Sequence, residues 1–249
     1  MARNSVLELI AAAMPSWFAL TTETGDAVEG RAEVRAASGP GKTVASLRIW
    51  VAVNEVEVAE AKPGSEFPAD CPERHINSDG SFCLGYGAGE AVYDLDDAIV
   101  WWGLLEEFLR LQRVAARTRR WPARKAIAHG PAGPHQVRAL EAARELGLEE
   151  DYYEMLEGEP KWFSGRFPRH SANGDRLLNG RLPCPMECLR GGRAILRRDC
   201  PRERLVAQLL SEERKRRAAE RAFVRATAVL ELKCCGAMKD CPRARLAQC

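Results

Sequence analysis

Hydrophobic and polar residues in the first quarter of the chain predict one helix and then a set of strands. Ser5 and Glu8 fit a capping box that begins a helix, and Pro15 ends it. Within residues 44–51 apolar and polar side chains partly alternate, as in a half-buried antiparallel strand. Turn-forming residues separate four segments of strand character, which are residues 17–22, 28–36, 43–53 and 56–59.

The pattern then changes to a long loop and a helix. Residues 62–93 are rich in Gly, Pro, Ser and Asp, and a loop of this length in a compact domain is usually functional or disordered. Residues 98–117 have a broad apolar face, which predicts a helix packed on the sheet. Its tryptophans, Trp101 and Trp102, are expected in the core. An aspartate is expected to cap this helix: Asp94, Asp96 or Asp97.

Two more helices are predicted in the second half. One begins near Pro134, which suits the first turn of a helix, and the other covers residues 202–232. The charged run at residues 212–217 is expected to form a solvated face of the latter helix. Residues 163–183 have the composition of a linker or an ordered loop.

The bulk composition is that of an ordinary globular protein. Of the 249 residues, 46% are hydrophobic and 29% charged, and no apolar run is long enough to cross a membrane. The N-terminal helix is short and carries an acid, so it does not resemble an export signal. These features predict a cytoplasmic protein with no membrane partner.

The net charge of +2 conceals an uneven distribution. From Arg181 onward there are 17 Lys and Arg residues against 8 Asp and Glu, so an acidic body precedes a basic tail. The tail has few aromatic residues among its basic ones, and the sequence therefore does not favour nucleic acid as a partner.

Nine cysteines in a chain without an export signal are more often catalytic or metal-binding than disulfide-bonded. Cys71 is expected to be a packing residue, and Cys249 a free thiol. A short repeat places Cys200 and Cys241 alike, each before a proline at a helix start, where a thiolate is stabilised. This suggests that both face one centre.

Zinc in a closed structural site needs four ligands. The spacing of the tail cysteines is not that of two Cys-x-x-Cys pairs, and a helical hairpin with free thiols is the alternative. We predict that zinc binds to four of six thiols: Cys184, Cys188, Cys200, Cys234, Cys235 and Cys241.

The long loop contains the segment most informative about chemistry, residues 72–84. Cys83 follows a tight polar turn, and His75 and Asn77 lie immediately upstream. This arrangement presents a nucleophilic thiol beside groups that can stabilise an oxyanion. The alternative is a half-buried structural thiol.

Residues 75–84 resemble the active-site loop of ubiquitin-conjugating enzymes, in which His-Pro-Asn leads through a polar turn and Gly-Ser to the catalytic Cys-Leu. The order of helix, strand meander, loop and helix over residues 1–130 is also similar. The Trp-Pro and His-Gly pairs at Trp121 and His129 resemble bacterial relatives from phage-defence and conjugation operons.

This resemblance implies an α+β ubiquitin-conjugating fold with a helical cysteine-rich tail. The expected domain is residues 1–162, followed by a linker at 163–183 and a basic, zinc-binding region at 184–249.

The match departs from the family at the histidine. Without a gap, His75 aligns with the family Asn, whereas a two-residue deletion would align His75 and Asn77 with the family His and Asn. Either residue could donate a hydrogen bond to the oxyanion. The family residue that positions the attacking amine lies after the cysteine, so His129 is a candidate by location alone.

The resemblance implies that Cys83 accepts the C-terminal carboxyl group of a ubiquitin-like protein as a thioester. An ATP-dependent activating enzyme would supply it, and a target protein would receive it on an amine or another nucleophile. No organic cofactor is expected. The alternative function is a non-catalytic interaction module on the same fold, whose basic, metal-bound tail docks a protein or nucleic acid.

Overall fold

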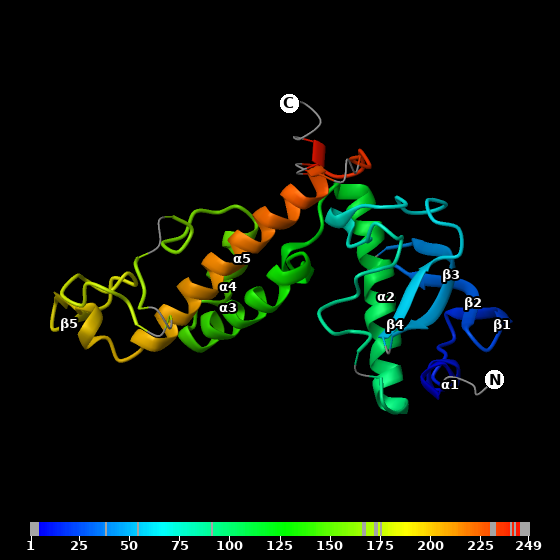
Figure 1. The fold of residues 1–249 in the computed structure, drawn as a ribbon, viewed down its shortest axis with the longest axis horizontal. Helices are drawn as coiled ribbons and strands as arrows, with labels where there is room; N and C mark the ends of the chain where they lie inside the picture. Colours follow the sequence, from blue (N-terminus) through cyan, green and yellow to red (C-terminus); the bar gives the residue numbers. More distant parts are fainter. Residues whose placement is uncertain are drawn as a thin grey trace. The chain divides into compact units, whose positions relative to one another are not determined.

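The computed structural model describes residues 5–37, 39–53, 55–90, 92–165, 168–171, 174, 176–229, 233–239, 241 and 243–244. The chain forms two compact units (Figure 1). Unit 1 combines Met1–Pro122 with Glu231–Cys249, and unit 2 is Ala123–Leu230. Among the described helices, none combines the length and the hydropathy needed to cross a bilayer.

A four-stranded antiparallel sheet forms the centre of unit 1. The strands are β1 (Phe18–Glu23), β2 (Ala27–Arg35), β3 (Lys42–Ala52) and β4 (Glu55–Glu60). They pair in sequence order, so the predicted meander is confirmed. Each strand lies close to the segment that the sequence pattern predicts.

Period-two alternation decides which face of the sheet is buried. In β3, Ala45, Leu47 and Ile49 are buried, while the residues between them face outward. Gly30 in β2 is required by close packing, because a Cβ atom there would lie 2.4 Å from the ring of Phe18.

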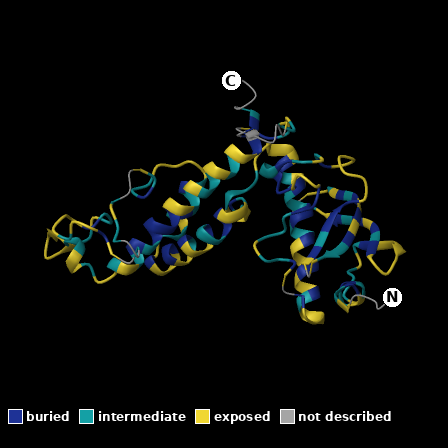
Figure 2. Ribbon diagram, viewed as in Figure 1, coloured by how far each residue is buried: buried dark blue, intermediate teal, exposed yellow. Residues whose placement is uncertain are grey.

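Helix α2 (Leu95–Thr118) packs its apolar face on the sheet, and α1 (Ser5–Ala12) packs against α2 (Figures 1 and 2). The Asp94 side chain accepts a hydrogen bond from the Asp97 amide, which confirms one of the predicted caps. Trp101 and Trp102 are only 1% and 2% exposed, as predicted for core residues.

Unit 2 is mainly helical, and its core lies between α3 (Gly133–Leu146), α4 (Glu149–Leu156) and α5 (Glu203–Val229). Helix α4 was not among the helices predicted from the sequence. Phe163 and Leu177 are buried in this core although they lie in the segment predicted as a linker. The remaining elements are short: η2 (Ala123–Lys125), η3 (Gly130–Ala132), β5 (Leu189–Arg190), β6 (Arg193–Ala194) and η4 (Arg197–Asp199).

The prediction that residues 212–217 form a solvated helix face is wrong for its two acids. Glu213 is fully buried and accepts hydrogen bonds from Arg216, Arg217 and the Tyr152 hydroxyl. Glu212 is nearly buried and is bound by His135, Arg138 and Lys215. The periodicity of the charges did not reveal these partners, because the partners outside α5 lie far away in sequence.

Protonation of Glu212 should weaken unit 2. Burial alone would raise the pKa of Glu212, but hydrogen bonds from Lys215, His135 and Arg138 lower it from 4.5 to about 2. A carboxyl group with a lowered folded-state pKa adds stability above pH 4.5, and this stability is lost as the pH falls toward 2.

We expect Glu212→Gln to reduce the acid sensitivity of α3 and α5, measured by hydrogen exchange as the pH falls below 4.5. The exposed Glu145→Gln on α3 is the matched control. Equal acid sensitivity in wild type and Glu212→Gln would contradict this account.

Candidate functional site

The segment before Cys83 is fixed to the sheet by backbone hydrogen bonds. After the short helix η1 (Pro72–Arg74), Ile76 exchanges two backbone hydrogen bonds of 3.1 Å with Cys71. The Phe82 amide donates to the Val58 carbonyl of β4 at 2.7 Å, and the Cys83 amide donates to the His75 carbonyl at 2.8 Å. The thiol therefore sits on a rigid loop beside β4.

The polar turn between Ile76 and Phe82 is closed by its own side chains. The Asn77 Nδ2 donates to Ser81 Oγ at 2.9 Å, and Ser81 Oγ donates to Asp79 Oδ1 at 2.7 Å. Gly80 has φ of 88°, in the left-handed region that favours glycine. Asn77 is exposed on this turn, so its side chain lies at the surface.

His75 is buried, with 7% of its surface exposed, and its backbone is left-handed at φ 55°. Its ring centroid lies 4.7 Å from that of Trp121, which in turn packs against Phe108 of α2. His75 of the loop and Trp121, which both belong to the family resemblance, are therefore in contact within unit 1.

A buried pair anchors η1 to α2. Arg74 Nε donates to Gln112 Oε1 at 2.7 Å, and Gln112 Nε2 donates to the Arg74 carbonyl at 2.7 Å. Gln112 is completely buried and Arg74 is 5% exposed. Because each polar group has a partner, this exchange fixes the loop without leaving a buried charge unsatisfied. Gln112 belongs to the predicted helix, but its partner Arg74 lies 38 residues away and could not be predicted from the pattern.

The other end of the loop is fixed at Gly89. The Val56 amide of β4 donates to the Gly89 carbonyl at 3.0 Å. A Cβ atom at Gly89 would lie 2.4 Å from the Val56 carbonyl oxygen, so no larger residue fits without a shift of the backbone. The segment between Cys83 and Gly89 thus runs from one fixed point to another.

The Cys83 thiol is partly buried, and its Sγ accepts a hydrogen bond from the Gly85 amide. Burial raises the pKa of this thiol, and the negative charge of Glu55 raises it further, while the Gly85 amide opposes both. Cys83 is therefore a neutral thiol at neutral pH.

Acidic side chains near Cys83 were missed by the sequence analysis. Glu55 acts on Cys83, and the pKa of Glu57 is raised by burial, by Asp79 and by Glu55. The signal available in the sequence was their alternation on β4, with Glu55 and Glu57 on one face beside the loop.

His129, the predicted substrate-positioning candidate, belongs to unit 2. Its amide donates to Glu220 Oε1 at 2.8 Å, its Nδ1 lies 3.2 Å from Glu220 Oε2, and its ring stacks on Phe223 at 4.8 Å. These contacts connect the residue to α5. A role toward an attacking amine stays a prediction.

The six tail cysteines fall in both units. Cys184, Cys188 and Cys200 are in unit 2, where the Sγ atoms of Cys184 and Cys200 are 3.8 Å apart. The other three are in unit 1: Cys234, Cys235 and Cys241.

Cys71 has a thiol neighbour that the sequence analysis did not foresee. Its Sγ lies 3.0 Å from that of Cys235. In the described part of the chain, no three His, Cys, Asp or Glu side chains are already spaced around a position for a metal ion.

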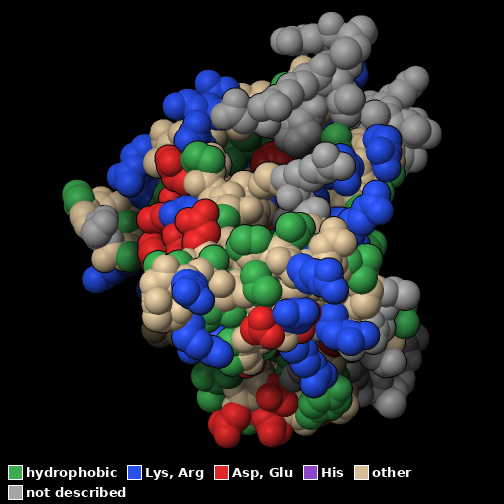
Figure 3. All heavy atoms as spheres, turned by 90° about the vertical axis from the view of Figure 1, so that its left-hand side faces the viewer, with side chains coloured by type: hydrophobic (Ala, Val, Ile, Leu, Met, Phe, Trp, Pro, Cys, Tyr) green, Lys and Arg blue, Asp and Glu red, His purple; other side chains and the backbone are tan. Residues whose placement is uncertain are grey.

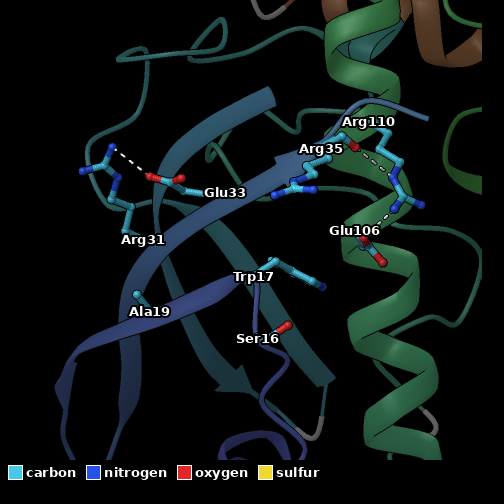
Figure 4. Close-up of a pocket in the computed structure, with 8 residues that line it drawn as sticks. All are labelled: Ser16, Trp17, Ala19, Arg31, Glu33, Arg35, Glu106 and Arg110. Atoms are coloured by element: carbon cyan, nitrogen blue, oxygen red, sulfur yellow. Dashed lines mark hydrogen bonds and ion pairs between the residues drawn. The ribbon is translucent and has the colours of Figure 1, made fainter. Parts of the chain in front are cut away.

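A separate groove of about 540 Å³ lies where β1 and β2 meet α2 (Figure 4). Arg110 crosses it, donating to Glu106 at 2.6 Å and to the Arg35 carbonyl at 3.2 Å. Most of the charged side chains that line the groove pair with one another, and the lining contains no thiol or imidazole. The lining residues are Ser16, Trp17, Ala19, Arg31, Glu33, Arg35, Glu106 and Arg110.

Acidic side chains also lie among the basic ones of the C-terminal part of the chain. Arg216 and Arg217 both pair with Glu213, and Lys215 pairs with Glu212. Figure 3 shows acidic and basic side chains interspersed over one face of the molecule. Three basic side chains of the charged run on α5 are therefore paired with acids of the same helix.

The raised pKa predicts slow alkylation of Cys83 at neutral pH. The rate constant with iodoacetamide should rise through an inflection above the ordinary cysteine value of 9.0. Glu55→Gln removes a negative charge and should move the inflection to lower pH. Mass spectrometry of the Cys83 peptide measures the rate, with the exposed Glu66→Gln as control. An inflection at or below 9.0 in the wild type would disprove the assignment.

Comparison with known families agrees with this geometry. Residues 17–123 match the family model "Prokaryotic E2 domain", and residues 128–243 match "Cysteine-rich domain, C-terminal to E2 domain". No curated protein and no solved structure gives a significant match to the chain.

The first match covers the sheet, Cys83 and α2, and it agrees with the predicted ubiquitin-conjugating fold. It supports a transferase-type role in ubiquitin-like conjugation, with a ubiquitin-like protein and an activating enzyme as partners in general. The two matches together span nearly the whole chain in the predicted order. The chain therefore belongs to the prokaryotic E2-domain proteins that carry a cysteine-rich domain after the E2 domain.

Proposed function

We propose that the chain is a thioester carrier that receives a ubiquitin-like protein on Cys83. The observation that carries this proposal is the rigid presentation of Cys83 beside β4, between the polar turn and Gly89, within a prokaryotic E2 domain. The bond from the donor sulfur to the acyl carbon breaks, and a bond from Cys83 Sγ to that carbon forms. Cys83 loses its thiol proton during the attack, and the donor sulfur, released as a thiolate, takes up a proton.

The raised pKa of the Cys83 thiol is compatible with this thioester exchange. The donor is already activated as a thioester, and thioester exchange replaces one bond by another of the same kind. Catalysis then depends on positioning and on stabilising the tetrahedral oxyanion, more than on a permanent thiolate. A neutral Cys83 is also protected from oxidation and unwanted alkylation, because the thiolate is the reactive form.

We propose Asn77 as the oxyanion donor and His75 as a positioning residue. A side-chain amide has two N–H donors, and the hydrogen bond to Ser81 uses one of them. Asn77 is exposed, whereas the His75 ring is buried against Trp121. His75 contributes through its carbonyl, which accepts the hydrogen bond from the Cys83 amide.

The carboxylates near the loop supply a further part of the mechanism. Glu55, Glu57 and Asp79 create a negative field that would attract the ammonium group of a target lysine. The raised pKa of Glu57 makes it a stronger base than an ordinary carboxylate, so Glu57 is the candidate group to accept the amine proton. The thiolate of Cys83 would leave when the amide bond forms.

We also propose that thiols of the cysteine-rich domain bind zinc structurally. In a tetrahedral zinc thiolate, sulfur atoms lie about 3.8 Å apart. Cys184 and Cys200 have this separation, and Cys188 is close enough to act electrostatically on Cys184. The Met186 amide donates to Cys184 Sγ, which favours the deprotonated ligand.

The pathway we propose is a bacterial conjugation or phage-defence system.

Charging of Cys83 should be visible on a non-reducing gel. With ATP, a bacterial activating enzyme and its ubiquitin-like protein, we expect an adduct that thiol reductant removes. Cys83→Ala should give none, and Cys83→Ser an ester that resists reductant. Cys249→Ala is the matched thiol control and should charge as wild type does. No adduct from a charged activating enzyme would instead favour the interaction module.

The role of Asn77 is tested by separating charging from discharge. Asn77→Ala should lower the rate of discharge to lysine about 100-fold, the usual cost of one lost oxyanion donor. Ser81→Ala removes the same hydrogen bond but keeps the amide, so its effect should be much smaller. Single-turnover discharge of pre-formed thioester measures both. Equal losses in the two variants would show that Asn77 only supports the turn.

A further inference from the structure

Unit 1 contains a second group of cysteines, apart from Cys83. The group joins Cys71, which precedes η1, to three residues of the C-terminal segment: Cys234, Cys235 and Cys241. The Sγ atoms of Cys71 and Cys235 are 3.0 Å apart, and the side chains of Cys234 and Cys241 are hydrogen-bonded to one another. We call these four residues the tail-anchor cysteines.

The tail-anchor cysteines lie in an apolar environment. Cys71 and Cys241 are 1% and 2% exposed, and they share a small core with Ala115 and Met238. Buried thiols can simply pack as small apolar groups. Packing alone does not explain why four thiols from two distant parts of the chain gather here. Each close pair of thiols also places polarisable sulfur lone pairs next to one another.

Backbone amides point at every sulfur of the group. Gly236 donates to Cys234 Sγ and Ala237 to Cys235 Sγ, both at 3.4 Å. Arg74 donates to Cys71, and two amides after Cys241 donate to its sulfur. Neutral thiols are weak acceptors, whereas thiolates accept such hydrogen bonds well. These amides therefore favour negative charge on the sulfur atoms, whereas burial and the neighbouring thiols oppose it at Cys71 and Cys241.

Further contacts hold the C-terminal segment at this position. Arg243 Nη1 donates to Asp70 Oδ2 at 2.6 Å, next to Cys71 in the sequence. The Lys239 amide donates to the Arg119 carbonyl at 2.8 Å, and Arg119 donates to the Gly236 carbonyl at 3.1 Å. The segment is thus bound on both sides of its cysteines, to the start of η1 and to the end of α2.

We propose that the tail-anchor cysteines bind one zinc ion as four thiolates. Each thiol releases its proton on binding, and the metal neutralises half of the charge that results. Zinc accepts four sulfur ligands in a closed structural site, and the N–H donors satisfy their remaining lone pairs. Cys71 and Cys235 are closer than the roughly 3.8 Å of a tetrahedral zinc thiolate, so one sulfur moves outward when the ion enters.

The site would connect the cysteine-rich part to the catalytic loop. Cys71 exchanges backbone hydrogen bonds with Ile76, and Ile76 pairs with Phe82, the neighbour of Cys83. A metal bound at Cys71 therefore fixes the base of the loop that presents the thiol. This inference does not depend on thioester chemistry, because the ligands are distinct from Cys83.

Zinc content measured by mass spectrometry tests the site. Relative to wild type, Cys71→Ser and Cys235→Ser should each lose one equivalent of zinc per chain. Cys83→Ala, a cysteine change in the same loop, should lose none. Cys71→His keeps a zinc ligand and should retain most of the metal, which separates loss of a ligand from failure to fold. Cobalt(II) bound to the wild type should give the visible spectrum of a tetrahedral tetrathiolate, and Cys71→His a weaker sulfur-to-cobalt band.

Limited trypsin digestion supplies a readout of structure. Cleavage after Lys233 and Lys239 should be slow in the zinc-bound protein, and faster after chelation or in Cys71→Ser. Full zinc content in Cys71→Ser would overturn the proposal, as would a Cys71–Cys235 disulfide in protein purified without oxygen. If Cys83→Ala loses charging and keeps its zinc, the result supports both the thioester function and the separate zinc site. Normal zinc without charging in wild type would refute only the thioester function.

Discussion

The hydrogen-bond exchange between Arg74 and Gln112 is the interaction on which the loop that carries Cys83 depends. Both side chains are buried, and each satisfies polar groups of the other. The buried guanidinium needs the acceptors of Gln112, because a buried donor left without its hydrogen-bond partner costs about 1–3 kcal/mol, and more when the donor is charged. The packing of α2 on the sheet therefore also determines where η1 lies, and with it His75 and Cys83.

The chemistry proposed for this loop follows from its electrostatics. Burial and the carboxylate of Glu55 raise the pKa of the Cys83 thiol, and in the proposed mechanism Glu55, together with Glu57 and Asp79, would attract a cationic target amine. A site of this kind works with an activated donor and does not need a reactive thiolate at rest. The acidic surroundings and the high thiol pKa are then two consequences of one arrangement.

The C-terminal cysteines give the second theme of the structure. Their sequence spacing indicated metal binding but could not indicate which thiols share a centre. From the sequence, Cys71 is expected to be a packing residue, and it is indeed buried, but it also has a thiol neighbour. Its neighbour Cys235 is 164 residues away, and only the return of the C-terminal segment to unit 1 brings the two sulfurs together.

The sequence by itself determined the helix, the meander and α2, because local periodicity and caps specify these elements through burial of one face. It also determined the order of motif residues around Cys83, which is a property of contiguous chain. Only the tertiary structure decided the partners of Gln112, Glu213 and Cys71, since these pairings join distant segments. Local patterns indicate whether a position is buried. Which group then becomes the hydrogen-bond partner of a buried polar side chain depends on how the whole chain folds.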